Sequence, residues 1–149
     1  MTDVRLPGHV SVSATLDYRT GNRVWNYTEA LRCDGQKCRG SEEPTAPLDV
    51  QAAAVANQLA PDEAGYYQDA SFAKLRDVGL RWTIPGSVTA VIGTRADLTI
   101  AGRNLATWTK YRGLDPEVSH QPPYILPRQE LATLPLPREF IVRLDVRGQ

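Results

Sequence analysis

The stretch that decides the fold is DASFAKLRDVGLRWTIPG, residues 69–86. Its second half alternates apolar side chains with polar or small ones, which is the period of a β-strand with one apolar face. The apolar positions are Val78, Leu80, Trp82 and Ile84. A Pro85-Gly86 pair then predicts a turn. Because the apolar face ends in a tryptophan and the other face carries charge, the question is what covers the apolar side.

The same alternation recurs along the chain and predicts an all-β protein of about four antiparallel strands. The expected strands are His9–Trp25, Gln68–Ile84, Ala96–Trp108 and Arg138–Arg147. Within the first of them, Thr20-Gly21-Asn22 fits either a hairpin turn or a bulge inside one long strand.

The connections between these strands differ in length. The connection Pro85–Arg95 is short, whereas Asn26–Tyr67 and Lys110–Pro137 are long. The first long connection contains a predicted short helix, Leu48–Leu59, which is bounded by a proline on each side. Short turns at one end and long loops at the other are typical of a transmembrane β-barrel.

Composition excludes some classes of protein. The 149 residues fit one domain, and 17 basic residues balance 17 acidic ones, so no charge pattern favours nucleic acid as a partner. No apolar run approaches the roughly 20 residues of a membrane-spanning helix, and the first residues lack the features of a secretory signal. Taken alone, these features favour a cytoplasmic protein. A search for long apolar runs does not detect the strands of a β-barrel, because their hydropathy alternates.

The two faces of the predicted strands have different chemistry. In a soluble sandwich the charged face meets water, and in a barrel it lines the lumen while the apolar face meets lipid. The candidates for the lumen face are Asp17, Arg19, Asp77, Arg81, Arg103, Arg143 and Asp145. The candidates for the lipid face are Val10, Val12, Leu16, Val78, Leu80, Trp82, Val142 and Leu144.

Aromatic residues near the predicted strand ends match the two interfacial girdles of a membrane barrel. They are Trp25, Trp82, Trp108 and Phe140. Lys74 and Arg76 conflict with this pattern, because they share the parity of Val78 and Leu80. Either a bulge near Leu75 changes the register, or both side chains reach an interface.

Two cysteines, Cys33 and Cys38, flank a turn-forming Asp34-Gly35 pair. Their spacing favours a small disulfide loop, with two free thiols as the alternative. A zinc site fits less well, since it needs about four ligands and the histidines, His9 and His120, are distant in sequence.

No sequence motif of a nucleophilic enzyme, a phosphate-binding loop or a metalloprotease occurs. We therefore expect no enzyme, no catalytic residues, no metal and no cofactor.

Several segments resemble the C-terminal end of SusC/RagA-type TonB-dependent outer-membrane receptors. They are DASFAKLRDVGLRWTIP (69–85), LTIAGRNLATWTKYRGLDPEV (98–118) and LPREFIVRLDV (136–146), preceded by VSVSATLDYRTGNRVWNYTEALRC (10–33). The resemblance implies that residues 1–149 are the C-terminal segment of a barrel of about 22 strands in the bacterial outer membrane.

Receptors of this family import glycans or peptides with energy relayed by TonB. The resemblance implies three further partners: the rest of the barrel with its plug, a surface lipoprotein lid, and outer-membrane lipid. Because no plug or TonB-contacting box is present, we expect a fragment, a split gene product or a decayed copy that is not active alone. A soluble stand-alone β-domain that binds carbohydrate or protein is the alternative.

The resemblance also implies a topology. Pro85–Arg95 is expected on the periplasmic side, and Asn26–Tyr67 and Lys110–Pro137 outside the cell. Four antiparallel strands would then place both chain ends on the periplasmic side.

Overall fold

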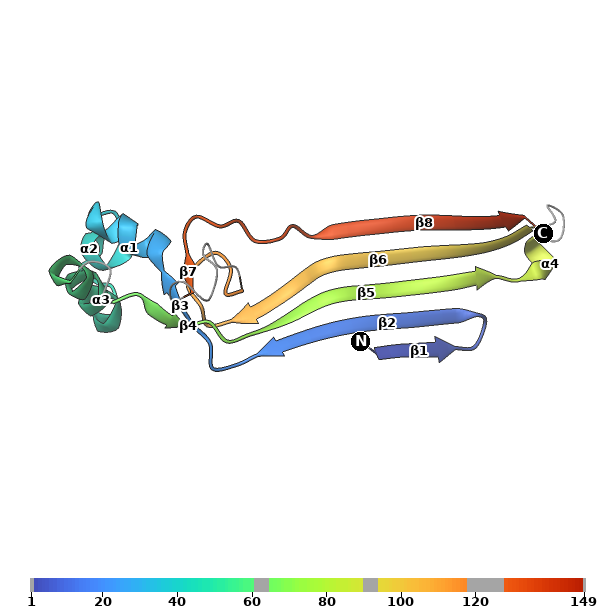
Figure 1. Ribbon diagram of the computed structural model, residues 1–149, viewed down its shortest axis with the longest axis horizontal. Coiled ribbons are helices and arrows are strands. Elements are labelled where there is room, and N and C mark those ends of the chain that lie inside the picture. Colours follow the sequence, from blue (N-terminus) through green and yellow to red (C-terminus); the bar gives the residue numbers. More distant parts are fainter. Residues whose placement is uncertain (1, 61–64, 90–93, 118–127, 149) are drawn as a thin grey trace. The chain divides into compact units, whose positions relative to one another are not determined.

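A computed structural model describes residues 2–60, 65–89, 94–117 and 128–148. The chain folds into two compact units (Figure 1). The strand unit comprises Met1–Tyr18, Ala73–Trp108 and Leu136–Gln149, and the loop unit comprises Arg19–Phe72 and Thr109–Pro135. The loop unit thus contains Asn26–Tyr67 and most of Lys110–Pro137, the two predicted connections. It also contains Arg19–Trp25 and Gln68–Phe72, which the sequence assigns to strands.

The strand unit is built on a five-stranded sheet in the order β1-β2-β5-β6-β8 (Figure 1). Its strands are β1 (Thr2–Leu6), β2 (Val10–Arg19), β5 (Phe72–Ile84), β6 (Thr94–Thr109) and β8 (Glu139–Gly148). The pairs β1–β2 and β6–β8 are antiparallel. The short helix α4 (Gly86–Thr89) follows the turn proline after β5. The expected all-β antiparallel fold is therefore confirmed.

The register places like side chains opposite one another. Val4 lies opposite Val12, and Leu98 lies opposite Leu144. On the other face, Thr99 lies opposite Arg143. Since successive side chains of a strand point to opposite faces, one face of the sheet is apolar and the other is polar.

Helices and a small sheet form the loop unit. Its helices are α1 (Tyr27–Asp34), α2 (Arg39–Glu42) and α3 (Leu48–Leu59). Its sheet has the order β4-β3-β7, from β3 (Arg23–Asn26), β4 (Tyr67–Asp69) and β7 (Gln129–Glu130). Strand β3 pairs antiparallel with β4 and parallel with β7.

Local sequence explains where these helices begin. Asn26 caps α1, because its side-chain oxygen accepts a hydrogen bond of 3.0 Å from the backbone N–H of Glu29. Helix α3 begins directly after Pro47 and has the predicted bounds, Leu48–Leu59. Among the described residues, no helix is long and apolar enough to cross a membrane.

Three sequence-based expectations about the strands need correction. The segment His9–Trp25 is neither a hairpin nor one bulged strand. It breaks at Thr20–Asn22, where Gly21 has a φ of 76°, and continues as β3 in the other sheet. Gln68–Ile84 likewise divides into β4 and β5. The alternation stops at Thr20–Asn22, so the sequence marks a break there, but it does not show that the following strand joins another sheet.

The third correction concerns β1, which the sequence reading missed. Strand β1 reverses the direction of the chain and places Thr2 opposite Ala14. Four strands would place both chain ends at one end of the sheet. Instead, Thr2 lies beside the middle of β2, and Gly148 lies opposite Thr94, where β6 begins.

Candidate functional site

The polar face of the sheet carries ion pairs between neighbouring strands. Arg81 of β5 contacts Asp97 of β6 at 2.8 Å, and Thr83 donates a hydrogen bond of 2.6 Å to the same carboxylate. Arg103 and Asp77 pair at 3.5 Å. Within β8, Arg143 donates two hydrogen bonds, of 2.9 and 2.7 Å, to Asp145. The arginine of each pair is more than half exposed, so water screens these pairs and they add little to the stability of the sheet.

The structure also shows where the other lumen-face candidates lie. Asp17 pairs with Arg76 at 2.8 Å, so the charge that conflicted with the alternation of β5 has a partner within the strand unit. Arg19 belongs to the loop unit, where its guanidinium lies 5.8 Å from the ring centre of Phe72. Arg19 is therefore separate from the ion pairs of the sheet.

The opposite face of the sheet is apolar and exposed. Val142 pairs with Ile100 across β8 and β6, and Val10 pairs with Leu6 across β2 and β1. A Cβ on Gly79 would lie 2.8 Å from the hydroxyl oxygen of Ser13. Val78, Leu80 and Trp82 therefore lie on the side away from Ser13. The exposed apolar residues of the sheet strands include Val4, Leu6, Leu16, Leu80, Trp82, Ile100, Phe140, Val142, Leu144 and Val146.

One of the expected girdle aromatics lies elsewhere. Trp25 is only 8% exposed and belongs to the core of the loop unit, where its ring stacks on Tyr27 at 4.6 Å. It does not mark the end of a strand in the five-stranded sheet. Trp82, Trp108 and Phe140 are exposed on strands of that sheet.

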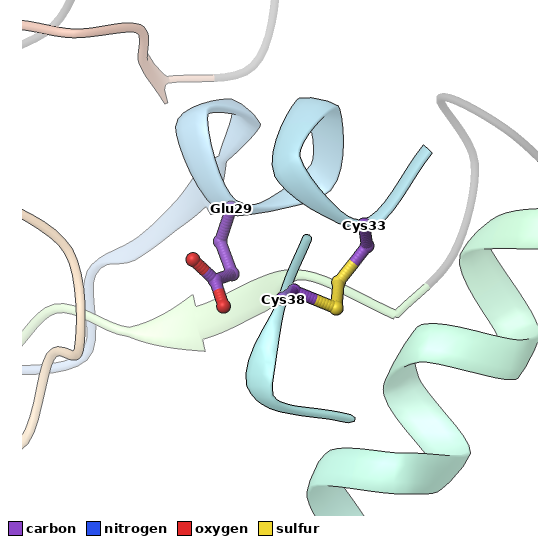
Figure 2. A group of neighbouring side chains, drawn as sticks. All are labelled: Glu29, Cys33 and Cys38. Carbon is purple, nitrogen blue, oxygen red and sulfur yellow. A yellow bond between two sulfur atoms is a disulfide. The ribbon is translucent and has the colours of Figure 1, made fainter. Parts of the chain in front are cut away.

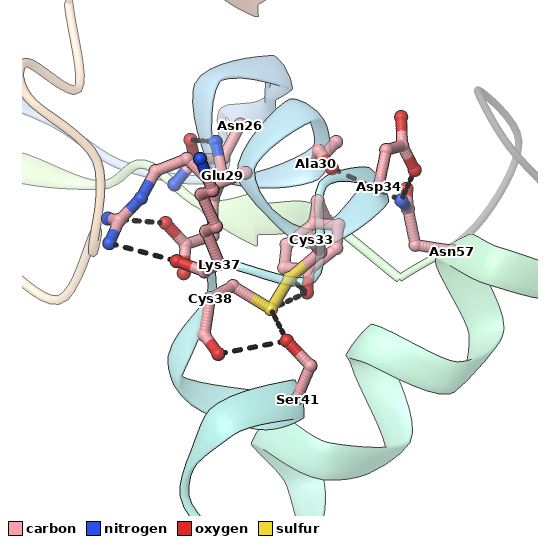
Figure 3. Close-up of a disulfide and its surroundings, with 11 residues drawn as sticks. Asn26, Glu29, Ala30, Cys33, Asp34, Lys37, Cys38, Ser41 and Asn57 are labelled. Atoms are coloured by element: carbon pink, nitrogen blue, oxygen red, sulfur yellow. Dashed lines mark hydrogen bonds and ion pairs between the residues drawn. A yellow bond between two sulfur atoms is a disulfide. The ribbon is translucent and has the colours of Figure 1, made fainter.

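A disulfide joins Cys33 and Cys38 in the core of the loop unit (Figure 3). Both cysteines are fully buried and pack with Trp25, Ala54 and Tyr66. The disulfide closes the turn between α1 and α2 across a Cα–Cα distance of 4.8 Å.

Tyr66 lies against the disulfide. Its hydroxyl is 2.5 Å from the Cys33 sulfur and 3.9 Å from the Cys38 sulfur. Because a disulfide sulfur has no proton, the tyrosine hydroxyl is the donor. Burial, together with the negative charges of Glu29 and Asp34, raises the pKa of Tyr66 to about 12. Tyr66 therefore stays protonated and keeps this hydrogen bond at neutral pH.

Glu29, Cys33 and Cys38 form a cluster of potential metal ligands, with ligand atoms within 4.8 Å of one another (Figure 2). Zinc binds thiolates, and here the two sulfurs are bonded to each other. The cluster therefore offers one carboxylate, which already accepts a bond from Arg32 at 3.1 Å.

A fully buried carboxylate joins the two long connections. Glu130 of β7 accepts a hydrogen bond of 2.8 Å from the Thr28 hydroxyl of α1, and a weaker one of 3.4 Å from the Tyr111 hydroxyl. Thr133 adds its backbone N–H at 3.3 Å. Burial and the adjacent charge of Glu130 raise the pKa of Tyr111 well above its usual range.

A pocket of about 600 Å³ opens in the loop unit, within the size range of small-ligand sites. Its lining combines apolar and charged residues. Its apolar lining is Pro47, Val50, Ala53, Gly65 and Tyr66, and its polar lining is Glu29, Arg32, Arg39, Asp49, Gln68, Asp69, Lys110 and Arg112.

None of the sequence-based candidates lines this pocket. The polar lining residues come from α1, α2, α3, β4 and the second long connection, and only the fold brings them together. One signal was available: Asn26 followed three residues later by Glu29 is a typical helix start, and it places α1. His120 lies outside the described residues.

No protein-family model matches the chain, and no curated protein matches its sequence. Solved structures do match its fold. The chain aligns with the RagAB peptide transporter at a TM-score of 0.64 and 19% identity. It aligns with the RagAB peptide importer in the open-open state at 0.61 and in the closed-closed state at 0.57, each with 21% identity.

These alignments cover 93% of this chain but only 15–16% of each solved chain. At this level of identity the likeness establishes the fold. The chain has the fold of a small section of a much larger protein.

Proposed function

We propose that this chain is a C-terminal segment of an outer-membrane, TonB-dependent importer that takes up glycans or peptides. The strand unit would form part of the membrane wall, and the loop unit would lie outside the cell. In this proposal the chain performs no catalysis and binds no cofactor. Its partners are the remaining strands and plug of the receptor, a surface lipoprotein lid, TonB and outer-membrane lipid.

The main support for this proposal is that the five-stranded sheet has one apolar face and one polar face. Its apolar face is exposed over all five strands, and its polar face is matched by ion pairs such as Arg81–Asp97. In water, an exposed apolar surface of this extent is a hazard for aggregation. Between lipid and a polar lumen, both faces meet a suitable solvent, since barrel strands alternate apolar outward and polar inward.

The comparisons support the same interpretation at the level of the fold. The matched solved structures are those of a peptide transporter, and this chain corresponds to about one seventh of their length. The sequence resemblance to SusC/RagA-type receptors adds TonB dependence, the lid and the outer-membrane location as expectations.

Quenching of Trp82 by lipid tests the proposal. Two single-tryptophan forms of the full chain are mixed with vesicles whose acyl chains carry bromine, which quenches tryptophan on contact. One form keeps Trp82, from the apolar face, and the other keeps Trp25, from the core of the loop unit, with phenylalanine at the remaining positions. We expect quenching of Trp82 and little quenching of Trp25, because only Trp82 would reach the hydrocarbon.

Equal fluorescence of Trp82 with and without brominated lipid would contradict the membrane role. If the chain also remains a folded monomer without detergent, the soluble β-domain becomes the better interpretation.

A further inference from the structure

Three side chains with metal-binding atoms converge beside the turn between α1 and α2 (Figure 2). Cys33 follows Glu29 by four residues in α1, so the two side chains lie on one face of that helix. Cys38 directly precedes α2. The two sulfurs and a carboxylate oxygen of Glu29 all lie within 4.8 Å of one another. The S–S bond occupies both sulfurs in the oxidised protein, so this ligand set depends on the redox state of the chain.

Helix α3 holds α1 and α2 in place independently of the disulfide. The buried Asn57 of α3 donates hydrogen bonds of 2.6 Å to the Asp34 carboxylate and 3.3 Å to the Ala30 carbonyl of α1. A Cβ on Gly40 of α2 would lie only 2.9 Å from the Cβ of Ala54 in α3, so these two helices are in close contact. The Cα atoms of the cysteines are 4.8 Å apart. Reduction in this frame leaves two neighbouring thiols that can reach one ion.

Hydroxyl groups flank both sulfurs (Figure 3). The Tyr66 hydroxyl is 2.5 Å from the Cys33 sulfur, and the Ser41 hydroxyl is 3.3 Å from the Cys38 sulfur. A hydroxyl can donate a hydrogen bond to a thiolate and so stabilise the charged form. Metal ligands are commonly oriented by such neighbouring donors. The surroundings of the two cysteines therefore suit thiolates bound to a metal.

The chemistry of the donors indicates which metal. Calcium and magnesium take oxygen ligands, whereas zinc takes thiolates together with carboxylates. Two thiolates and one carboxylate around Zn²⁺ leave one net negative charge. The guanidinium of Arg32, 3.1 Å from the Glu29 carboxylate, supplies the compensating positive charge. This balance matters because an uncompensated charge is costly in a buried site.

Glu29 links the cluster to solvent. Its side chain is 27% exposed and lines the pocket of the loop unit, whereas both cysteines are buried. Neighbouring ligands of tetrahedral zinc lie about 3.3–3.8 Å apart, because Zn–O and Zn–S bonds are about 2.0 and 2.3 Å long. The carboxylate must therefore move toward the sulfurs by about 1 Å. A partly exposed, flexible side chain can make this movement without a change in the helices.

We propose that Glu29, Cys33 and Cys38 form a zinc site that becomes available when the disulfide is reduced, with water as the fourth ligand. A dithiol reductant transfers two electrons to the disulfide by thiol–disulfide exchange and becomes a disulfide itself, and the protein is left with two thiols. Zn²⁺ then displaces the two thiol protons to solvent and binds both sulfurs and the carboxylate. The site lies within the loop unit and does not depend on the proposed membrane role.

The test compares zinc binding by the oxidised and the reduced full chain, in detergent and without oxygen. Dithiothreitol reduces the chain and is removed by gel filtration, thiol titration confirms the reduction, and a colorimetric chelator competes for zinc. We expect about one tightly bound Zn²⁺ per reduced chain and none per oxidised chain. Cadmium in place of zinc should give the ultraviolet charge-transfer band of metal–thiolate bonds in the reduced chain only.

A pair of variants distinguishes a folded site from two free thiols. Glu29→Gln should weaken zinc binding by at least about tenfold, because a neutral amide replaces a charged ligand. The control, Glu42→Gln, removes the same charge from the first turn of α2, outside the cluster, and should leave the affinity unchanged. Two thiols in an unfolded chain would bind zinc equally well in both variants. Circular dichroism checks that each reduced variant is folded.

Several results would overturn the proposal. They are equal zinc binding before and after reduction, a Glu29→Gln variant that binds as tightly as the parent, and a disulfide that resists excess dithiol in the folded chain. Zinc should also raise the thermal midpoint of the reduced parent, because a ligand of the folded state stabilises it by mass action. A reduced parent whose midpoint zinc leaves unchanged likewise contradicts the site.

Discussion

Two phenylalanines illustrate how differently the two units treat apolar side chains. Phe72, which begins β5 and is the last residue of the first loop-unit segment, is 2% exposed, whereas Phe140 in the strand unit is 79% exposed. The loop unit buries a cluster of apolar residues around a disulfide, although Leu48, Leu59 and Leu134 are each more than 80% exposed. The strand unit leaves leucines, valines and aromatics uncovered along a whole face. The loop unit therefore has a core around its disulfide, and the described part of the strand unit has an exposed apolar face.

The most direct test of this difference in burial is to make the same substitution in both units. Phe72→Ala should lower the free energy of unfolding by about 3–5 kcal/mol, because it leaves a cavity in a packed core. Phe140→Ala in detergent should change it by only about 0.5 kcal/mol. Denaturant titration of the two variants in the same detergent provides the measurement. Equal losses would mean that Phe140 is covered by protein.

A second change tests the two faces of a single strand. Leu144→Arg places a charge on the apolar face of β8, opposite Leu98, and should cost roughly 2–4 kcal/mol in an assembled barrel. Arg143→Gln, on the polar face, breaks an exposed pair with Asp145 and should cost about 1 kcal/mol or less. Heat-modifiable gel mobility and denaturant titration measure folding. If Arg143→Gln lowered the free energy of unfolding more than Leu144→Arg, the apolar and polar faces would be assigned the wrong way round.

The disulfide is expected to act only on the loop unit. Replacing both Cys33 and Cys38 by serine should lower its stability by about 2 kcal/mol, since the closed loop is short. The thermal midpoint of the parent, with and without reductant, measures this effect. The double variant is the control, because reductant should not change its midpoint. A parent chain that is insensitive to reductant would show that α1 and α2 are held by packing alone.

The smallest expected effect on stability comes from the titration of Tyr66 and occurs only at high pH. The pKa of Tyr66 is raised to about 12, from 10 in an unfolded chain, so folding favours the protonated form. This stabilisation is complete below about pH 10 and is lost as the pH rises toward 12. The difference in stability between the parent and Tyr66→Phe should therefore narrow over this range and stay constant near neutrality. Tyrosinate absorbance checks the titration directly, and a normal titration of Tyr66 near pH 10 would contradict its burial.

Much of the strand unit could be predicted from the sequence. Alternation located β5, β6 and β8 to within a few residues, because most of each strand has one apolar face, which only Lys74 and Arg76 interrupt in β5. The prolines around Leu48–Leu59 bounded α3 correctly. Strand β1 was missed although Val4 and Leu6 alternate with Asp3 and Arg5, and Pro7-Gly8 marks the turn. Five residues were too short a pattern to stand out.

The loop unit could not be predicted in the same way. Strand β7 has only two residues, and its pairing with β3 is set by distant partners such as Thr28 and Glu130. The pocket likewise joins distant segments, since Lys110 and Arg112 come from the second connection. Local patterns contain no information about contacts of this kind, because they depend on which segments meet after the sheet has formed.

The Thr28–Glu130 contact also has a consequence for the order of folding. Its two residues are 102 positions apart, and Thr28 further accepts a bond from the backbone N–H of Ala132, 104 positions away. Closing so large a loop is entropically costly and slow. The sheet of the loop unit is therefore completed only when the C-terminal part of the chain is available, whereas the helices and the disulfide can form earlier. In a growing or translocating polypeptide, this unit is finished only when nearly the whole chain has arrived.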